Sequence, residues 1–214
     1  MIDSTDSGAT MPTVSLNSFL KILSKTSPQK VAEYGRYLKP GGYDFYWMLK
    51  EALRARTLEG KNFAECSLPI SKINRITEKK HNLDALKSFE KWINPITDTE
   101  FFDVPSAVIS SPGGTLKIKL EPSFGYVWEG QRRLVHTWAT QSPSLTQNLA
   151  ACGLYLLKEN LCLAEFSDCI PSILDLRKRS LFISDAIPRV VGPMVASELA
   201  WADEFFNAQS SAAA

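Results

Sequence analysis

The sequence predicts an α+β fold in which a small N-terminal helical bundle precedes an antiparallel β-meander with packed helices. Apolar residues recur at helical spacing up to about residue 94, whereas from Thr115 onward they alternate with polar residues at a period of two. Between these parts, residues 95–112 combine acidic side chains with a Ser-Ser-Pro-Gly-Gly turn. A run of helices followed by a run of strands is the order expected of this fold class.

Length and composition agree with a globular chain of one large or two small domains. The 214 residues are 44% hydrophobic and 22% charged, values close to the globular average. Met11 is a candidate for the true start of the chain. The expected boundaries are 1–14 for a disordered leader, 15–94 for a basic helical region, 95–112 for an acidic linker and turn, 113–208 for an antiparallel α+β domain, and 209–214 for a frayed tail.

Four helices are expected in the basic region, and each has a start signal. The first follows Ser15 as N-cap, and the second follows Ser27, with Pro28 at its first position. The third follows Asp44, and the fourth follows Asn82. The apolar side chains expected to be buried on these helices are Leu16, Phe19, Leu20, Leu23, Val31, Tyr34, Leu38, Trp47, Met48, Ala52, Leu83, Leu86, Phe89 and Ile93.

The C-terminal part is expected to contain five or six short strands and two helices. In residues 116–120, apolar side chains alternate with lysines, which predicts a strand with one solvated face. Further strands are expected at Phe124–Trp128, Arg132–Thr140, Leu161–Phe166, Ser172–Leu176 and Ser180–Ser184. One helix is expected after Ser142-Pro143, and a second from about Pro188 to Asn207, with Val190, Met194, Trp201 and Phe205 on its buried side.

Two registers are open for the hairpin between the second and third strands. A Glu129-Gly130 turn pairs Trp128 with Gln131, whereas a Gly130-Gln131 turn pairs Trp128 with Arg133. We favour the second register, because it places opposite charges and apolar side chains across from each other.

Several functional classes lack support in the sequence. No window holds the roughly 18 consecutive apolar residues of a membrane span, and the chain does not open with a basic stretch followed by an apolar one. The last three of the four cysteines are separated by 10 and 7 residues, which is not the spacing of a zinc site. No nucleophile elbow or phosphate-binding glycine loop occurs. We therefore expect a cytoplasmic protein with no membrane contact, no metal site and no cofactor.

Three residues are candidates for catalysis. Glu121 and Glu129 flank strands and could converge on the metal ion of a nuclease. His136 lies within a strand, where a histidine is more often a partly buried residue with one hydrogen bond than a general base. Because no catalytic motif surrounds them, we favour a protein that is not an enzyme.

Candidate binding residues lie in the hairpin and in the acidic linker. Trp128, Arg132 and Arg133 place an aromatic ring beside two arginines, a combination that stacks bases and contacts phosphates. Phe101 and Phe102 lie between acidic residues and are candidate anchors for a protein partner.

The charge distribution favours a role in binding. Residues 15–94 contain 15 basic and 8 acidic side chains, a net charge of +7, whereas the rest of the chain is acidic. We expect a cytoplasmic accessory or regulatory protein that binds a macromolecular partner, with a protein partner favoured. The alternative is a nucleic-acid-binding protein, including a metal-dependent nuclease. The sequence leaves the oligomeric state open.

Overall fold

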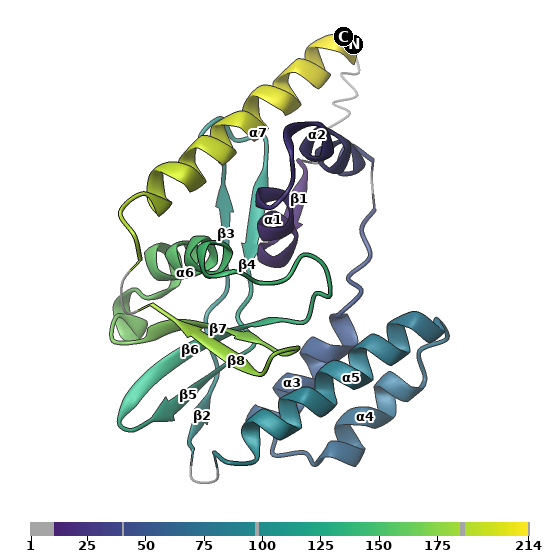
Figure 1. The fold of residues 1–214 in the computed structure, drawn as a ribbon, viewed down its shortest axis with the longest axis vertical. Helices are drawn as coiled ribbons and strands as arrows, with labels where there is room; N and C mark the ends of the chain where they lie inside the picture. Colours follow the sequence, from purple (N-terminus) through teal and green to yellow (C-terminus); the bar gives the residue numbers. More distant parts are fainter. Residues whose placement is uncertain (1–10, 40, 97–98, 185–186, 214) are drawn as a thin grey trace, which may run out of the picture.

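The computed structural model describes residues 11–39, 41–96, 99–184 and 187–213, and over these residues it is a mixed α+β structure (Figure 1). The α+β class is therefore confirmed, whereas the predicted order of a helical bundle and an antiparallel meander holds only in part. The described helices are α1 (Leu16–Leu23), α2 (Ser27–Arg36), α3 (Trp47–Leu58), α4 (Phe63–Ser71), α5 (Ile76–Ile93), α6 (Gln147–Leu161), a 3₁₀ helix (Ala164–Phe166) and α7 (Val191–Ala213). The described strands are β1 (Thr13–Ser15), β2 (Phe101–Phe102), β3 (Ala107–Ser110), β4 (Lys117–Leu120), β5 (Phe124–Trp128), β6 (Gln131–Trp138), β7 (Ile170–Asp175) and β8 (Ser180–Ile183).

The larger sheet has the strand order β2-β5-β6-β7-β8 and is mixed. Its β5–β6 and β7–β8 pairs are antiparallel, as a meander requires, but β6 and β7 are parallel. The predicted antiparallel meander is wrong at this point. Parallel neighbours need a long crossover, and α6 provides it by returning the chain to the end of the sheet at which β6 began.

The smaller sheet has the order β1-β4-β3, with β1 parallel and β3 antiparallel to β4. Thr13 and Val14 of the predicted leader lie in β1, where Val14 is buried, so these two residues are not disordered. Residues 1–10 of the leader lie outside the described part of the chain. The predicted linker likewise contains β2 and β3, because its apolar residues pair with β5 and β4.

Helices cover both faces of the larger sheet. On one face, α3, α4 and α5 pack together against Phe124, Val135 and Leu174. On the other face, α1, α6 and α7 form a second core with Leu134 and Ile173. The predicted N-terminal bundle is therefore confined to α3–α5, while α1 and α2 belong to the other core. Burial on both faces also explains why β6 and β7 are so apolar.

The predicted helix starts are correct to within a few residues, except in α5. Ser15 is the N-cap of α1, and its hydroxyl accepts a hydrogen bond from Ser18 N at 3.2 Å. The N-cap of α2 is Thr26, one residue before the predicted Ser27, and Gln29 completes a capping box. α4, which begins after the N-cap Asn62, was not predicted.

α5 begins at Ile76, so Asn82 lies inside the helix and is not its cap. Asn82 is fully buried; its Oδ1 accepts from Leu49 N at 3.0 Å, and its Nδ2 donates to Phe45 O at 2.9 Å. The side chain thus holds the start of α3 against α5. Trp47, predicted to be buried, is 56% exposed.

The hairpin adopts the register that we did not favour. Trp128 pairs with Gln131, so the predicted pairing of Trp128 with Arg133 is wrong. Glu129 and Gly130 form the turn with φ angles of 50° and 75°. Two successive left-handed residues are typical of the type I′ turn, whose twist matches that of the flanking strands.

Four predictions after the hairpin are also corrected. α6 starts after the N-cap Thr146 rather than at Ser142-Pro143, and the predicted strand over 161–166 is the end of α6 followed by the 3₁₀ helix. α7 continues into the predicted frayed tail, and Val190 and Met194 are exposed. The apolar residues that α7 buries are Val191, Val195, Leu199, Ala202 and Phe206. Within the described residues, no helix has the length and apolar character needed to cross a bilayer.

Candidate functional site

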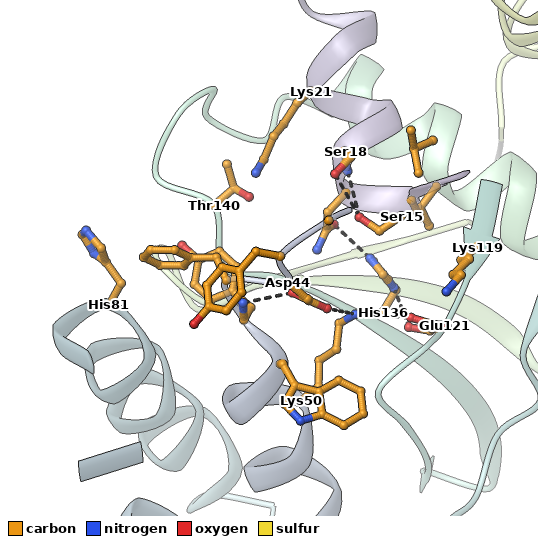
Figure 2. Close-up of a pocket in the computed structure, with 18 of the residues that line it drawn as sticks. Ser15, Ser18, Lys21, Asp44, Lys50, His81, Lys119, Glu121, His136 and Thr140 are labelled. Carbon is orange, nitrogen blue, oxygen red and sulfur yellow. Dashed lines mark hydrogen bonds and ion pairs between the residues drawn. The ribbon is translucent and has the colours of Figure 1, made fainter. Parts of the chain in front are cut away.

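A cleft of about 820 Å³ lies between the two cores. Its walls come from β1 and α1, from the segment that leads into α3, from the first turns of α5, and from the ends of β4 and β6 (Figure 2). The volume falls in the range of roughly 300–1,000 Å³ that is typical of small-molecule sites.

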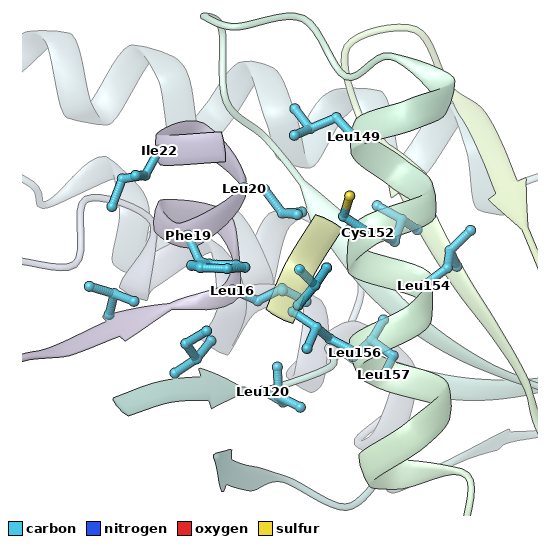
Figure 3. Close-up of a cluster of buried hydrophobic side chains, with 14 of the residues drawn as sticks. Leu16, Phe19, Leu20, Ile22, Leu120, Leu149, Cys152, Leu154, Leu156 and Leu157 are labelled. Carbon is cyan, nitrogen blue, oxygen red and sulfur yellow. The ribbon is translucent and has the colours of Figure 1, made fainter. Parts of the chain in front are cut away.

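The position of α1 against the cleft is fixed by its buried face. Leu16, Phe19 and Leu20 pack toward the apolar residues of α6, as Figure 3 shows. Lys21 lies on the opposite side of the helix and lines the cleft. Figure 2 shows its side chain pointing from α1 in the direction of Thr140.

Lys21 and Thr140 both have unused hydrogen-bonding capacity. No ion pair or hydrogen bond of the Lys21 amine is found among the described residues, and burial lowers its pKa although Glu33 and Asp44 act in the opposite direction. Thr140 is 4% exposed, and its hydroxyl has no partner in the described part of the chain. Buried polar groups are normally paired, so both groups are available to a ligand.

Lys50, in contrast, is committed to neighbouring carboxylates. Its Nζ lies 2.7 Å from Asp44 Oδ2 and 3.3 Å from Glu121 Oε2. Burial disfavours the charged amine, but the hydrogen bonds and charges of the two carboxylates raise its pKa above the usual value. Glu121, a predicted catalytic candidate, therefore lines the cleft as the partner of a lysine.

His136 lies at the base of the cleft and links β6 to α1. Its Nε2 is 2.9 Å from Asn17 Oδ1, and its Nδ1 is 3.1 Å from Glu121 O. Asn17 Nδ2 donates to Thr137 O at 3.1 Å, which directs Oδ1 toward the imidazole, so that each ring nitrogen faces a hydrogen-bond acceptor. Burial, followed by the charge of Lys50, lowers the pKa of His136 to about 4, although the Glu121 carbonyl acts in the opposite direction. The ring is thus neutral at pH 7, donates its one N–H proton to one of these two acceptors and serves to position α1.

Five aromatic side chains line the cleft: Tyr37, Tyr43, Phe45, Tyr46 and Trp47. The first four come from the segment that joins α2 to α3, and Trp47 is the first residue of α3. The Tyr46 hydroxyl donates to Ala139 O at 2.9 Å, and the Tyr43 hydroxyl donates to the Glu78 carboxylate. Tyr43 and Trp47 remain 66% and 56% exposed, so they present aromatic surface to the solvent in the cleft.

The predicted binding residues Arg132 and Phe102 are brought together, but they bind each other. The guanidinium carbon of Arg132 lies 4.8 Å from the centre of the Phe102 ring and 5.5 Å from that of Phe166. Arg132 Nη1 also donates to Asp168 Oδ1 and to Glu165 O, both at 2.8 Å. The Arg132 guanidinium is therefore already bound to residues of the same chain.

The other predicted binding residues also have partners within the fold. Arg133 Nη1 donates to the hydroxyl of Tyr126, its cross-strand partner, at 3.3 Å. Phe101 and Trp128 are partly buried and pack against the core that includes α3–α5. None of these three residues lines the cleft.

The two predicted carboxylates are not brought together. Glu121 precedes β5 and Glu129 follows it, so a strand of about 17 Å separates them. Glu129 is exposed in the hairpin turn. Within the described residues, no three His, Cys, Asp or Glu side chains are grouped so that they could hold a metal ion.

Sequence reasoning did not single out Lys21, Thr140 or Asn17 as site residues. Lys21 was one of many lysines in a basic region, and Thr140 ends a strand without any motif around it. Trp47 was assigned to the core because of its helical spacing. The one usable signal was the density of aromatic residues from 43 to 47.

No protein-family model, no curated protein and no solved structure matches this chain. Its function is therefore inferred from the chemistry of its own residues.

Proposed function

We propose that this chain acts by binding, as a cytoplasmic accessory or regulatory protein, and that the cleft receives an anionic group of its partner. The observation that carries this proposal is the Lys21 amine, which is drawn partly out of water and has no anionic partner among the described residues. A partly desolvated lysine that lines the same cleft as an unpaired hydroxyl suits a phosphate or carboxylate, because a charge-assisted hydrogen bond is stronger than a neutral one. Thr140 supplies that hydroxyl.

The same anionic chemistry could come from a small ligand or from a macromolecule. A protein partner, which the sequence favours, would present an acidic side chain, and a nucleic acid would present a phosphate. The hairpin is not the proposed contact, because Arg132 already interacts with Asp168 and Phe102. No observation favours a nuclease, since Glu121 is paired with Lys50 and Glu129 lies at the other end of β5.

Calorimetric titration with pyrophosphate, penta-glutamate peptide and a single-stranded oligonucleotide tests the proposal and separates these sources. At least one of these probes should bind the wild-type chain at about 50 mM salt, a concentration at which phosphate contacts are strong. Replacing Lys21 by Met should weaken that binding about tenfold, because a hydrogen bond to a charged group contributes roughly 1.5–3 kcal/mol. The matched control is Lys87→Met, which removes an exposed lysine of α5 outside the cleft.

Each outcome decides the proposal. Binding of any probe that depends on Lys21 but not on Lys87 supports it, and the probe that binds best identifies the source of the anionic group. The proposal is overturned if none of the three probes binds, or if the Lys21→Met chain binds as tightly as the wild type.

A further inference from the structure

Two aromatic side chains that line the cleft, Trp47 and Tyr43, are mostly exposed to solvent. α3 buries Leu49, Ala52 and Leu53 in the core, but its first residue, Trp47, faces the cleft and is 56% exposed. Among the described residues, the Trp47 indole makes no aromatic or cation–π contact. Large aromatic side chains are usually mostly buried, so an exposed indole in a concave site is informative.

Tyr43 adds a second ring whose orientation is fixed. Its hydroxyl is bound to Glu78, and the Arg75 guanidinium lies 5.3 Å from the centre of its ring. Despite these contacts, 66% of Tyr43 is exposed. A ring held in this way loses little conformational freedom when a ligand stacks on it.

The cleft therefore combines two kinds of recognition in one cavity. Exposed rings alone would suit an apolar protein segment. Lys21 and Thr140, however, line the same cleft as these rings. Rings next to a cation suit a ligand that is itself a planar ring carrying an anion. Ser18 also lines the cleft and provides a hydroxyl for a hydrogen bond to a sugar.

We propose that the cleft binds a nucleoside phosphate, with its base against the rings of Trp47 and Tyr43 and its phosphate on Lys21 and Thr140. This inference rests on the proposed function, because it identifies the anionic group as the phosphate of a ring-bearing ligand. Stacking on aromatic side chains is tolerant of the base, since every base has a π-face. The proposal therefore names a ligand class and not a particular base.

The test compares adenosine diphosphate with the two ligands that lack its base, pyrophosphate and ribose 5-phosphate, by calorimetric titration of the full chain. Adenosine diphosphate should bind at least about tenfold more tightly than either, because one stacked base accounts for a factor of this size. Replacing Trp47 by Leu should abolish most of this advantage while leaving the affinity for pyrophosphate unchanged. Tyr43→Leu should act in the same direction, and Leu68→Ala, at an exposed apolar residue of α4 outside the cleft, should change nothing.

The possible results separate this inference from the proposed function. Equal affinity for adenosine diphosphate and pyrophosphate, or full retention of the adenosine diphosphate advantage in both ring variants, overturns the nucleoside inference and leaves the anion site standing. Absence of binding by all three ligands overturns the nucleoside inference, and the proposed function falls with it if penta-glutamate and the oligonucleotide also fail to bind. Binding of adenosine diphosphate that persists unchanged in Lys21→Met overturns the placement of the phosphate and the proposed function with it. Melting temperatures equal to that of the wild type show that the ring variants are folded.

Discussion

Acidification should destabilise this protein through His136. The imidazole is 4% exposed and joins β6 to α1 through Asn17. Protonation would place a positive charge at a buried position near Lys50, whose own charge also disfavours it. Opposing these effects are two acceptors, Asn17 Oδ1 and Glu121 O, which could both be satisfied only by a doubly protonated ring.

The magnitude follows from the pKa of His136, which is lowered from 6.5 to about 4. Because the folded-state pKa lies below the unfolded value, the unfolded chain takes up the proton first as the pH falls. The stability contributed by neutral His136 is therefore fully present above pH 6.5 and is lost as the pH falls toward 4. At roughly 1.36 kcal/mol per pKa unit, the maximum loss is about 3 kcal/mol, and about 2 kcal/mol of it falls between pH 7 and pH 5.

Urea denaturation of the wild type and of His136→Gln at these two pH values measures this loss. The wild type should lose about 2 kcal/mol more than the variant, because glutamine does not titrate. The control is His81→Gln, which retains His136. Between pH 7 and pH 5 this variant should lose as much free energy of unfolding as the wild type. Asp203 does not interfere in this window, because hydrogen bonds from Ser111 and Thr115 outweigh burial and hold its pKa below the usual value.

A titration of the ring nitrogens by NMR checks the cause directly. A His136 pKa above 6.5 would mean that the two acceptors outweigh burial and the Lys50 charge. Stability would then rise as the pH falls, and this reversal of sign would refute the reasoning.

Two further predictions concern the region of the hairpin. Gly125→Ala should lower the free energy of unfolding by about 1–3 kcal/mol in urea denaturation, because a Cβ at this position would lie 2.2 Å from the Phe102 ring; an unchanged midpoint would show that Phe102 moves aside freely. Arg132→Met should lower it by about 1 kcal/mol, because the variant loses a partly exposed ion pair with Asp168 and the cation–π contacts with Phe102 and Phe166. If the Arg132→Met chain keeps its stability but loses partner affinity, the hairpin is a binding site after all.

The features that the sequence predicted well depend on local interactions. The N-cap of α1 was identified because Ser15 and the apolar spacing after it act within one turn of helix. β5 and β6 were identified because their residues favour strands and a short turn joins them. Such signals involve residues that are neighbours in the chain, so they can be recognised without knowledge of the tertiary structure.

The errors arose where a distant contact decides the outcome. Asn82 has the chemistry of a helix cap, but its amide instead binds the backbone at the start of α3. The hairpin register is an exception: it was chosen from cross-strand charges, whereas the local conformation of Glu129 and Gly130 determines it. The parallel pairing of β6 with β7 depends on where α6 packs. The apolar helix between two apolar strands was nevertheless a signal that could have indicated this crossover.

The candidate site could not be assembled from the sequence, because its residues are distant in the chain. Lys21 and Thr140 come from opposite ends of the first two-thirds of the protein, and only the packing of α1 beside β6 places them in one cleft. Arg132 and Phe102 were selected from their residue types alone. In the structure these two side chains interact with each other. Among the described residues that line the cleft, unused capacity remains at the Lys21 amine, the Thr140 hydroxyl and the exposed Trp47 indole. Unsatisfied chemistry in a concave site is therefore the better criterion for function in this chain, and it can be applied only once the fold is known.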